Sequence, residues 1–178
     1  MKTFRLAVLA ATLVLAGCAT REPPRRAEPV RPSRTLPPVR SIAVSPAEYV
    51  GRAASTSLLI IRASEFVSER EGPSALGNEA RRVRADHEGI GAQLSLAGRR
   101  LNLLPSATLR PAHQLQLDAL QTAADPGRAY VELLGRTLPP LLTLHDQYRR
   151  LGTSPTLRPV AGMATPVIQR EVERIRRF

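Results

Sequence analysis

The three histidines are the side chains through which this sequence could most readily bind a metal or transfer protons. A di-metal site in a helical bundle needs about four glutamates and two histidines facing inward, typically as Glu-x-x-His pairs one helical turn apart. The sequence contains no such pair. His87 and Glu171, however, both fall on inward positions of two different predicted helices, so we expect them to meet inside a bundle.

A buried pair is the simplest interpretation of His87 and Glu171. Each group would satisfy a polar neighbour that is otherwise costly to bury. The alternative is a residual metal or proton site. It is disfavoured because two ligands without others bind a metal poorly.

The other two histidines offer no further chemistry. We expect His113 and His145 to be solvated, and His145 cannot form a dyad with Asp146 because adjacent helical residues do not face each other. The sequence shows no nucleophile elbow, no zinc-protease motif and no P-loop. It therefore predicts no enzyme activity, no catalytic residues, no metal site and no cofactor.

Cys18 is the only cysteine, and its surroundings indicate a reactive role. Met1–Arg5 is basic, an apolar run follows to Leu15, and small residues precede Cys18, which is the order of a secretory signal. The tetrapeptide Leu15-Ala16-Gly17-Cys18 resembles the lipobox of bacterial lipoproteins. That resemblance implies removal of residues 1–17 as a signal peptide and lipid attachment, including fatty acids such as palmitate, at Cys18. Ala19 implies the outer membrane, facing the periplasm.

Residues 18–44 then form a linker rich in proline and arginine, with six arginines between 19 and 44. Such density of proline blocks helix and sheet hydrogen bonds. We expect an extended spacer reaching up to roughly 80 Å. An alternative is an arginine-rich strip that binds lipid phosphates, peptidoglycan or lipopolysaccharide.

The formal charge of +11 does not indicate nucleic-acid binding, because much of it lies in the signal and the linker. Tryptophan is absent and aromatic residues make up 3%, which argues against base-stacking or sugar-stacking surfaces. The partners that remain are the membrane, through the lipid anchor, and an envelope protein or peptidoglycan.

The segment 45–178 has the pattern of an all-α domain. Ser45-Pro46 begins a helix that ends near Arg70, and a four-and-three spacing of apolar residues predicts a second helix over 76–101. A short helix follows over 111–123. Asp125-Pro126 begins another helix, with a kink or break at Pro139-Pro140, and a last helix follows a cap at Ser154. The sequence predicts an antiparallel four-helix bundle with a short inserted helix.

Several short motifs between about Ser45 and Arg174 resemble those of the DUF4142 family of exported bacterial bundles with a ferritin-like fold and unknown function. They are Tyr49-Val50 with Ala53-Ala54, Arg84-Ala85-Asp86-His87, Arg128-Ala129-Tyr130-Val131, and the turn Gly152…Pro155…Leu157. Members of that family usually carry an acidic residue at the position of Ile60, histidines at Leu138 and Glu171, and Phe-Asp at Pro126-Gly127. Asp86 and His87 keep the polar pattern.

The sequence as a whole predicts a non-enzymatic cell-envelope lipoprotein with a structural or protein-interaction role at the membrane. Two alternatives stay open. One is a ferritin-like metal-binding or stress-related protein that uses the His87 and Glu171 site, and the other is a tether to peptidoglycan or lipopolysaccharide through the linker.

Overall fold

A computed structural model describes residues 44–178, which contain five α-helices and no strand. The predicted signal peptide, Cys18 and almost all of the linker lie outside the described residues. The helices are α1 (Pro46–Glu71), α2 (Ala75–Arg99), α3 (Pro111–Gln121), α4 (Pro126–Leu151) and α5 (Arg158–Ile175).

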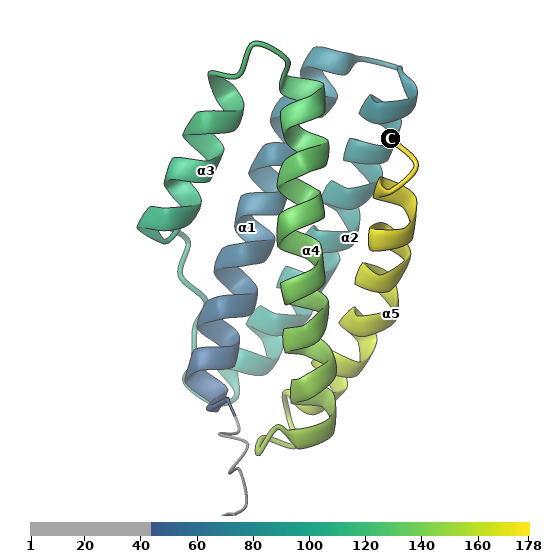
Figure 1. The fold of residues 1–178 in the computed structure, drawn as a ribbon. Coiled ribbons are helices and arrows are strands. Elements are labelled where there is room, and N and C mark those ends of the chain that lie inside the picture. Colours follow the sequence, from purple (N-terminus) through teal and green to yellow (C-terminus); the bar gives the residue numbers. More distant parts are fainter. Residues whose placement is uncertain (1–43) are drawn as a thin grey trace, which may run out of the picture. The chain divides into compact units, whose positions relative to one another are not determined.

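The four long helices form a closed antiparallel bundle (Figure 1). α1 packs against α2 and α4, and α5 completes the ring by packing against the same two helices. The chain between α2 and α4 runs back along the bundle and carries α3, which lies against α1 and α4 (Figure 1). One such long crossover is the connectivity of ferritin-like bundles. The predicted bundle of four long helices with one short inserted helix is confirmed.

The ends of the first helices follow from local hydrogen bonding. The Ser45 hydroxyl accepts from the Glu48 amide at 3.2 Å, and Ser74 accepts in the same way from the Gly77 amide at 3.0 Å. Both serines therefore satisfy an amide that has no partner within the helix. The Glu48 carboxylate pairs with Arg52, one helical turn further on, at 3.3 Å.

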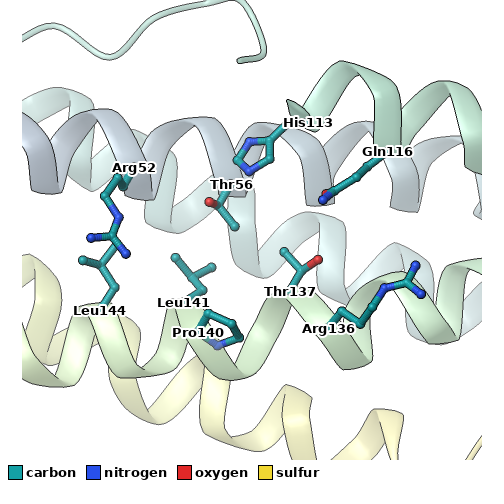
Figure 2. A pocket seen from close by; sticks show the side chains of 9 residues that line it. All are labelled: Arg52, Thr56, His113, Gln116, Arg136, Thr137, Pro140, Leu141 and Leu144. Atoms are coloured by element: carbon teal, nitrogen blue, oxygen red, sulfur yellow. The ribbon is translucent and has the colours of Figure 1, made fainter. Parts of the chain in front are cut away.

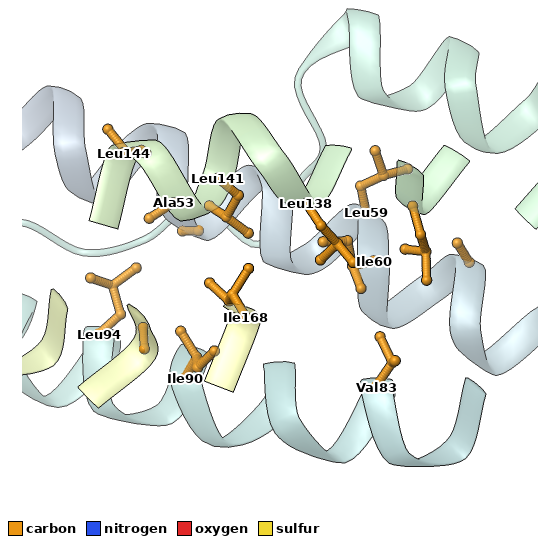
Figure 3. Packing of buried hydrophobic residues seen from close by; sticks show 14 of the residues in the cluster. Ala53, Leu59, Ile60, Val83, Ile90, Leu94, Leu138, Leu141, Leu144 and Ile168 are labelled. Carbon is orange, nitrogen blue, oxygen red and sulfur yellow. The ribbon is translucent and has the colours of Figure 1, made fainter. Parts of the chain in front are cut away.

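Apolar side chains from all four long helices meet along the bundle axis (Figure 3). The regular spacing in α2 predicted this correctly, since its inward positions are buried: Ala80, Val83, His87, Ile90, Leu94 and Ala97. In α4 Leu138 is buried, whereas the adjacent Thr137 is only partly buried. Leu138 and Ile60 are both completely buried within the apolar cluster.

Two consecutive prolines lie inside α4, yet the helix is continuous. Pro139 and Pro140 have no N–H, so the carbonyls of Gly135 and Arg136 lose their partners in the helix. All four residues are exposed, so water can reach the freed carbonyls. The continuous helix agrees with the unbroken phase of the apolar pattern and excludes a break into two helices.

The last helix begins later than its sequence signal indicates. Ser154 holds a preceding turn, because its hydroxyl accepts from the Leu157 amide at 3.4 Å and its carbonyl accepts from the Arg158 amide at 3.1 Å. Pro159 cannot donate the next bond of the ladder because it has no N–H. Regular helix therefore starts at Arg158, with Leu157 in the cap position.

Two glycines of α2 predict opposite effects of the same substitution. Gly89 is exposed with nothing near its missing Cβ, so Gly89→Ala should raise the free energy of unfolding by about 0.5–1 kcal/mol. A Cβ at Gly98 would collide with the Leu103 carbonyl, so Gly98→Ala should lower the free energy of unfolding by about 1–3 kcal/mol. Urea unfolding of the full chain measures both values. Stabilisation by Gly98→Ala would contradict the tight turn at the end of α2.

Candidate functional site

The centre of the bundle contains a buried histidine–carboxylate pair. His87 of α2 and Glu171 of α5 are each 0% exposed, and His87 Nε2 lies 3.2 Å from Glu171 Oε2. The second ring nitrogen, Nδ1, lies 3.2 Å from the Ser57 hydroxyl of α1. The predicted meeting of His87 and Glu171 is therefore confirmed, and Ser57 extends the pair to a third helix.

This pair lacks the further ligands that a metal centre would need. Residues 44–178 contain no group of three or more histidine, cysteine, aspartate or glutamate side chains able to hold one metal ion. Glu171 Oε1 is buried and has no hydrogen-bond partner among the described side chains. The geometry therefore supports a hydrogen-bonded pair that is closed off from solvent and has one carboxylate oxygen without a partner.

A second buried polar contact joins α1 to α4. The hydroxyls of Ser64 and Tyr130 are 2.7 Å apart, and both residues are completely buried. Burial raises the pKa of Tyr130 well above its usual value, so the phenol stays protonated. This contact was not predicted, because a serine on an apolar helix face gives no signal of its partner.

The structure overturns the prediction that His145 is solvated. His145 is 0% exposed, and its Nδ1 lies 2.9 Å from the Tyr49 hydroxyl. Tyr49 also stacks on Tyr148, with ring centroids 3.8 Å apart. Burial is the larger cause, and the charge of His87 the smaller, of the lowering of the pKa of His145 to about 3. His145 is therefore a neutral core residue at physiological pH.

The wrong prediction of a solvated His145 has an identifiable cause. A core-facing helical stripe spans at least about 100°, which is wide enough to include two adjacent residues. Leu138, Leu141, His145 and Tyr148 are spaced by three, four and three. That pattern indicates an inward face that includes His145, although the spacing through the adjacent Leu144 is equally regular. The expected separation of His145 from Asp146 is confirmed, because Asp146 pairs with Arg149 at 2.6 Å.

His113 is also less exposed than predicted. It lies in the first turn of α3, where it is partly buried, and its Nδ1 lies 2.8 Å from the Ser55 hydroxyl of α1. Burial lowers the pKa of His113, and the positive charge of Arg110 adds a smaller lowering. This histidine helps to hold the short helix against α1.

An ion-pair cluster links α2 to α5 near the bundle surface. Arg174 Nε lies 2.6 Å from Glu79, which is 5% exposed, and Arg174 Nη2 lies 3.4 Å from Asp86. His87 makes no hydrogen bond to the adjacent Asp86 among the described interactions, and adjacent helical residues do not face each other. Asp86 therefore has a structural role in joining two helices.

A surface pocket of about 180 Å³ opens between α1, α3 and α4 (Figure 2). Arg52 and Arg136 lie at opposite ends of it, and His113 and Gln116 of α3 lie above Pro140 and Leu141 of α4 (Figure 2). The complete lining contains no acidic residue: Arg52, Thr56, His113, Gln116, Arg136, Thr137, Pro140, Leu141 and Leu144. The pocket is thus basic and polar over an apolar floor.

No helix within residues 44–178 is both long enough and apolar enough to cross a membrane. Cys18, the predicted site of lipid attachment, lies outside the described residues.

Comparison with known proteins places the chain in a family. Residues 32–178 match the family described as a domain of unknown function, DUF4142. Neither the curated proteins nor the solved structures contain a significant match. The matched segment covers most of the chain, including all five helices. The chain belongs to the DUF4142 family.

Proposed function

We propose that this protein is a non-enzymatic cell-envelope lipoprotein, held at a membrane by lipid on Cys18 and acting there as a structural or interaction module. The observation that carries the proposal is the sequence Leu15-Ala16-Gly17-Cys18 after a basic and apolar leader. Several acyl chains on one residue give stable anchoring, whereas a single chain binds only marginally.

The interior of the bundle supports a role without catalysis. His87 and His145 are both completely buried, and each is hydrogen-bonded to a neighbouring side chain. A general acid or base has to come within hydrogen-bond reach of its substrate. Groups closed inside a packed bundle serve better to align helices than to transfer protons to a ligand.

The membrane is the first partner in this proposal, and an envelope protein or peptidoglycan is the second. The arginine-rich segment 19–44 provides positive charge that suits anionic lipid headgroups or cell-wall carboxylates. Outer-membrane placement, facing the periplasm, follows from Ala19 after the cysteine and is part of the proposal.

If Cys18 is lipidated, its replacement should change where the protein is found in the cell. The native chain should appear in the membrane fraction, with a mature N-terminus at residue 18 that carries acyl mass by mass spectrometry. Cys18→Ser should move the protein to the soluble fraction and abolish that mass. Ala19→Asp is the matched control, because it should keep the acyl mass while moving the protein from the outer to the inner membrane.

The proposal fails if the mature chain begins elsewhere or if residue 18 carries no acyl group. A metal-binding function is the second candidate, favoured by the unpartnered Glu171 Oε1 beside His87. Stoichiometric metal in untagged protein that disappears in His87→Ala would establish that candidate instead.

A further inference from the structure

We infer that the groove between α3 and α4 binds an amphiphilic anion: a monomeric molecule with one carboxylate or phosphate group and a single alkyl chain. Two adjacent cavities form this groove, and they share Gln116 and Arg136. The first is the basic pocket of Figure 2, and the second is an apolar slot of about 250 Å³. This inference does not depend on the proposed lipid anchor.

Positive charge at the first cavity is poorly neutralised. Arg136 has no ion pair among the described contacts, because the nearby Glu132 pairs with Arg128 at 3.1 Å. Arg52 pairs with Glu48 at 3.3 Å, and both of these side chains are substantially exposed. An exposed pair of this kind is weak, so an incoming anion can compete for Arg52.

A third arginine strengthens the positive potential beside this cavity. The Arg110 guanidinium lies over Gly51 of α1, and its charge contributes to the lowered pKa of His113. A neutral His113 beside Gln116 and the Thr56 hydroxyl offers polar groups for an oxyanion. Guanidinium groups are well suited to carboxylate and phosphate, which they bind through two parallel hydrogen bonds.

The second cavity continues the groove with a mostly apolar lining, to which Gln116, Arg136 and Glu132 also contribute, and Glu132 is paired with Arg128. Leu115, Ala119 and Leu120 of α3 face Ala129 and Leu133 of α4 across it. Leu115 is 70% exposed, which is high for a large aliphatic side chain beside a cavity. An alkyl chain lying in this slot would cover Leu115 and remove apolar surface from water.

Charge decides which molecule fits. The segment 19–44 of this chain carries six arginines and would be repelled by Arg52 and Arg136. A concave slot between two helices accommodates one chain rather than the face of a bilayer. A monomeric alkyl anion matches both the basic end and the apolar end.

The test uses the full chain with Cys18→Ser, which carries no acyl group of its own. Titration calorimetry compares decanoate and decyl phosphate, both below their micellar concentrations, with hexanoate and with neutral 1-decanol. Each methylene contributes roughly fourfold in affinity at full burial, so decanoate should bind at least tenfold more tightly than hexanoate. It should also bind at least tenfold more tightly than 1-decanol, because the alcohol has no charge for the arginines.

Variants locate the binding in the groove. Arg52→Gln with Arg136→Gln should weaken decanoate binding at least tenfold, and Ala119→Asp should do the same by placing a negative charge in the apolar slot. Arg170→Gln is the matched control, because Arg170 is exposed on α5, which does not line the groove. Circular dichroism should show the same melting temperature for all of these proteins within a few degrees.

Three outcomes would overturn the inference. Equal affinity for decanoate and hexanoate would remove the role of the apolar slot. Unchanged binding in the double arginine variant would remove the role of the basic pocket. Binding to phosphatidylglycerol vesicles without binding to monomeric decanoate or decyl phosphate would identify a bilayer surface as the partner instead.

Discussion

Replacing His87 with leucine is expected to lower the free energy of unfolding by about 3 kcal/mol or more. Glu171 is completely buried, and His87 Nε2 is its partner at 3.2 Å. Its other carboxylate oxygen already lacks a partner among the described side chains. Removing one member of a buried polar pair leaves the other desolvated without compensation, which costs about 3–5 kcal/mol. Urea unfolding of the full chain, followed by circular dichroism, measures the change.

The double variant separates the pair from simple loss of packing. His87→Leu combined with Glu171→Leu removes both polar groups, so its stability should return to within about 1 kcal/mol of the native chain or exceed it. Asp86→Ala is the control for a neighbouring position, because its pair with Arg174 is partly exposed and should contribute less than about 1 kcal/mol. If the double variant were as unstable as His87→Leu alone, the buried pair would not explain the loss.

The sequence was sufficient to predict the helices because their apolar residues recur with a regular spacing. In α2 the spacing of four and three identified the inward face, including His87. The meeting of His87 with Glu171 followed from placing each residue on an inward face. Ser57 was not predicted as the third member, since many serines occur in this chain and spacing alone does not show which one approaches a histidine.

The surface groove could not have been predicted from the sequence. It depends on where the crossover places α3, and no local pattern determines that position. Leu117 and Leu120 bury one side of α3, while Leu115 stays exposed beside the slot. Arg52 and Arg136 are far apart in the sequence and line the same pocket only because α1 and α4 are neighbours in the ring.

The buried polar contacts share one physical consequence. The pairs Ser64–Tyr130, His87–Glu171 and Tyr49–His145 each join two different helices. A shift of one helix along its neighbour would leave these groups unsatisfied inside the core, at a cost of about 1–3 kcal/mol for each group. We therefore expect these contacts to fix α1 relative to α4 and α2 relative to α5, and the hydrogen bond of His87 to Ser57 to fix α2 relative to α1. The apolar core determines these positions less specifically.

The buried, neutral imidazole of His145 should make the folded chain less stable in acid. Its pKa in the folded chain is about 3, below the ordinary value of 6.5. The unfolded chain therefore binds a proton at His145 between these two values, while the folded chain does not. Stability from the neutral imidazole is complete above pH 6.5 and falls by about 1.4 kcal/mol for each pH unit as the pH drops towards 3.

The comparison between pH 7.5 and pH 4.5 isolates this residue. His145→Leu has nothing to titrate at this position, so it should lose about 2–3 kcal/mol less than the native chain over this range. Tyr49, Tyr148 and His87 are the titratable groups around His145, and both tyrosines stay protonated because burial raises the pKa of each. His113→Gln is the control, since His113 is only partly buried and should change the pH dependence less. Parallel curves for the native chain and His145→Leu would show that the imidazole accepts a proton without unfolding the bundle.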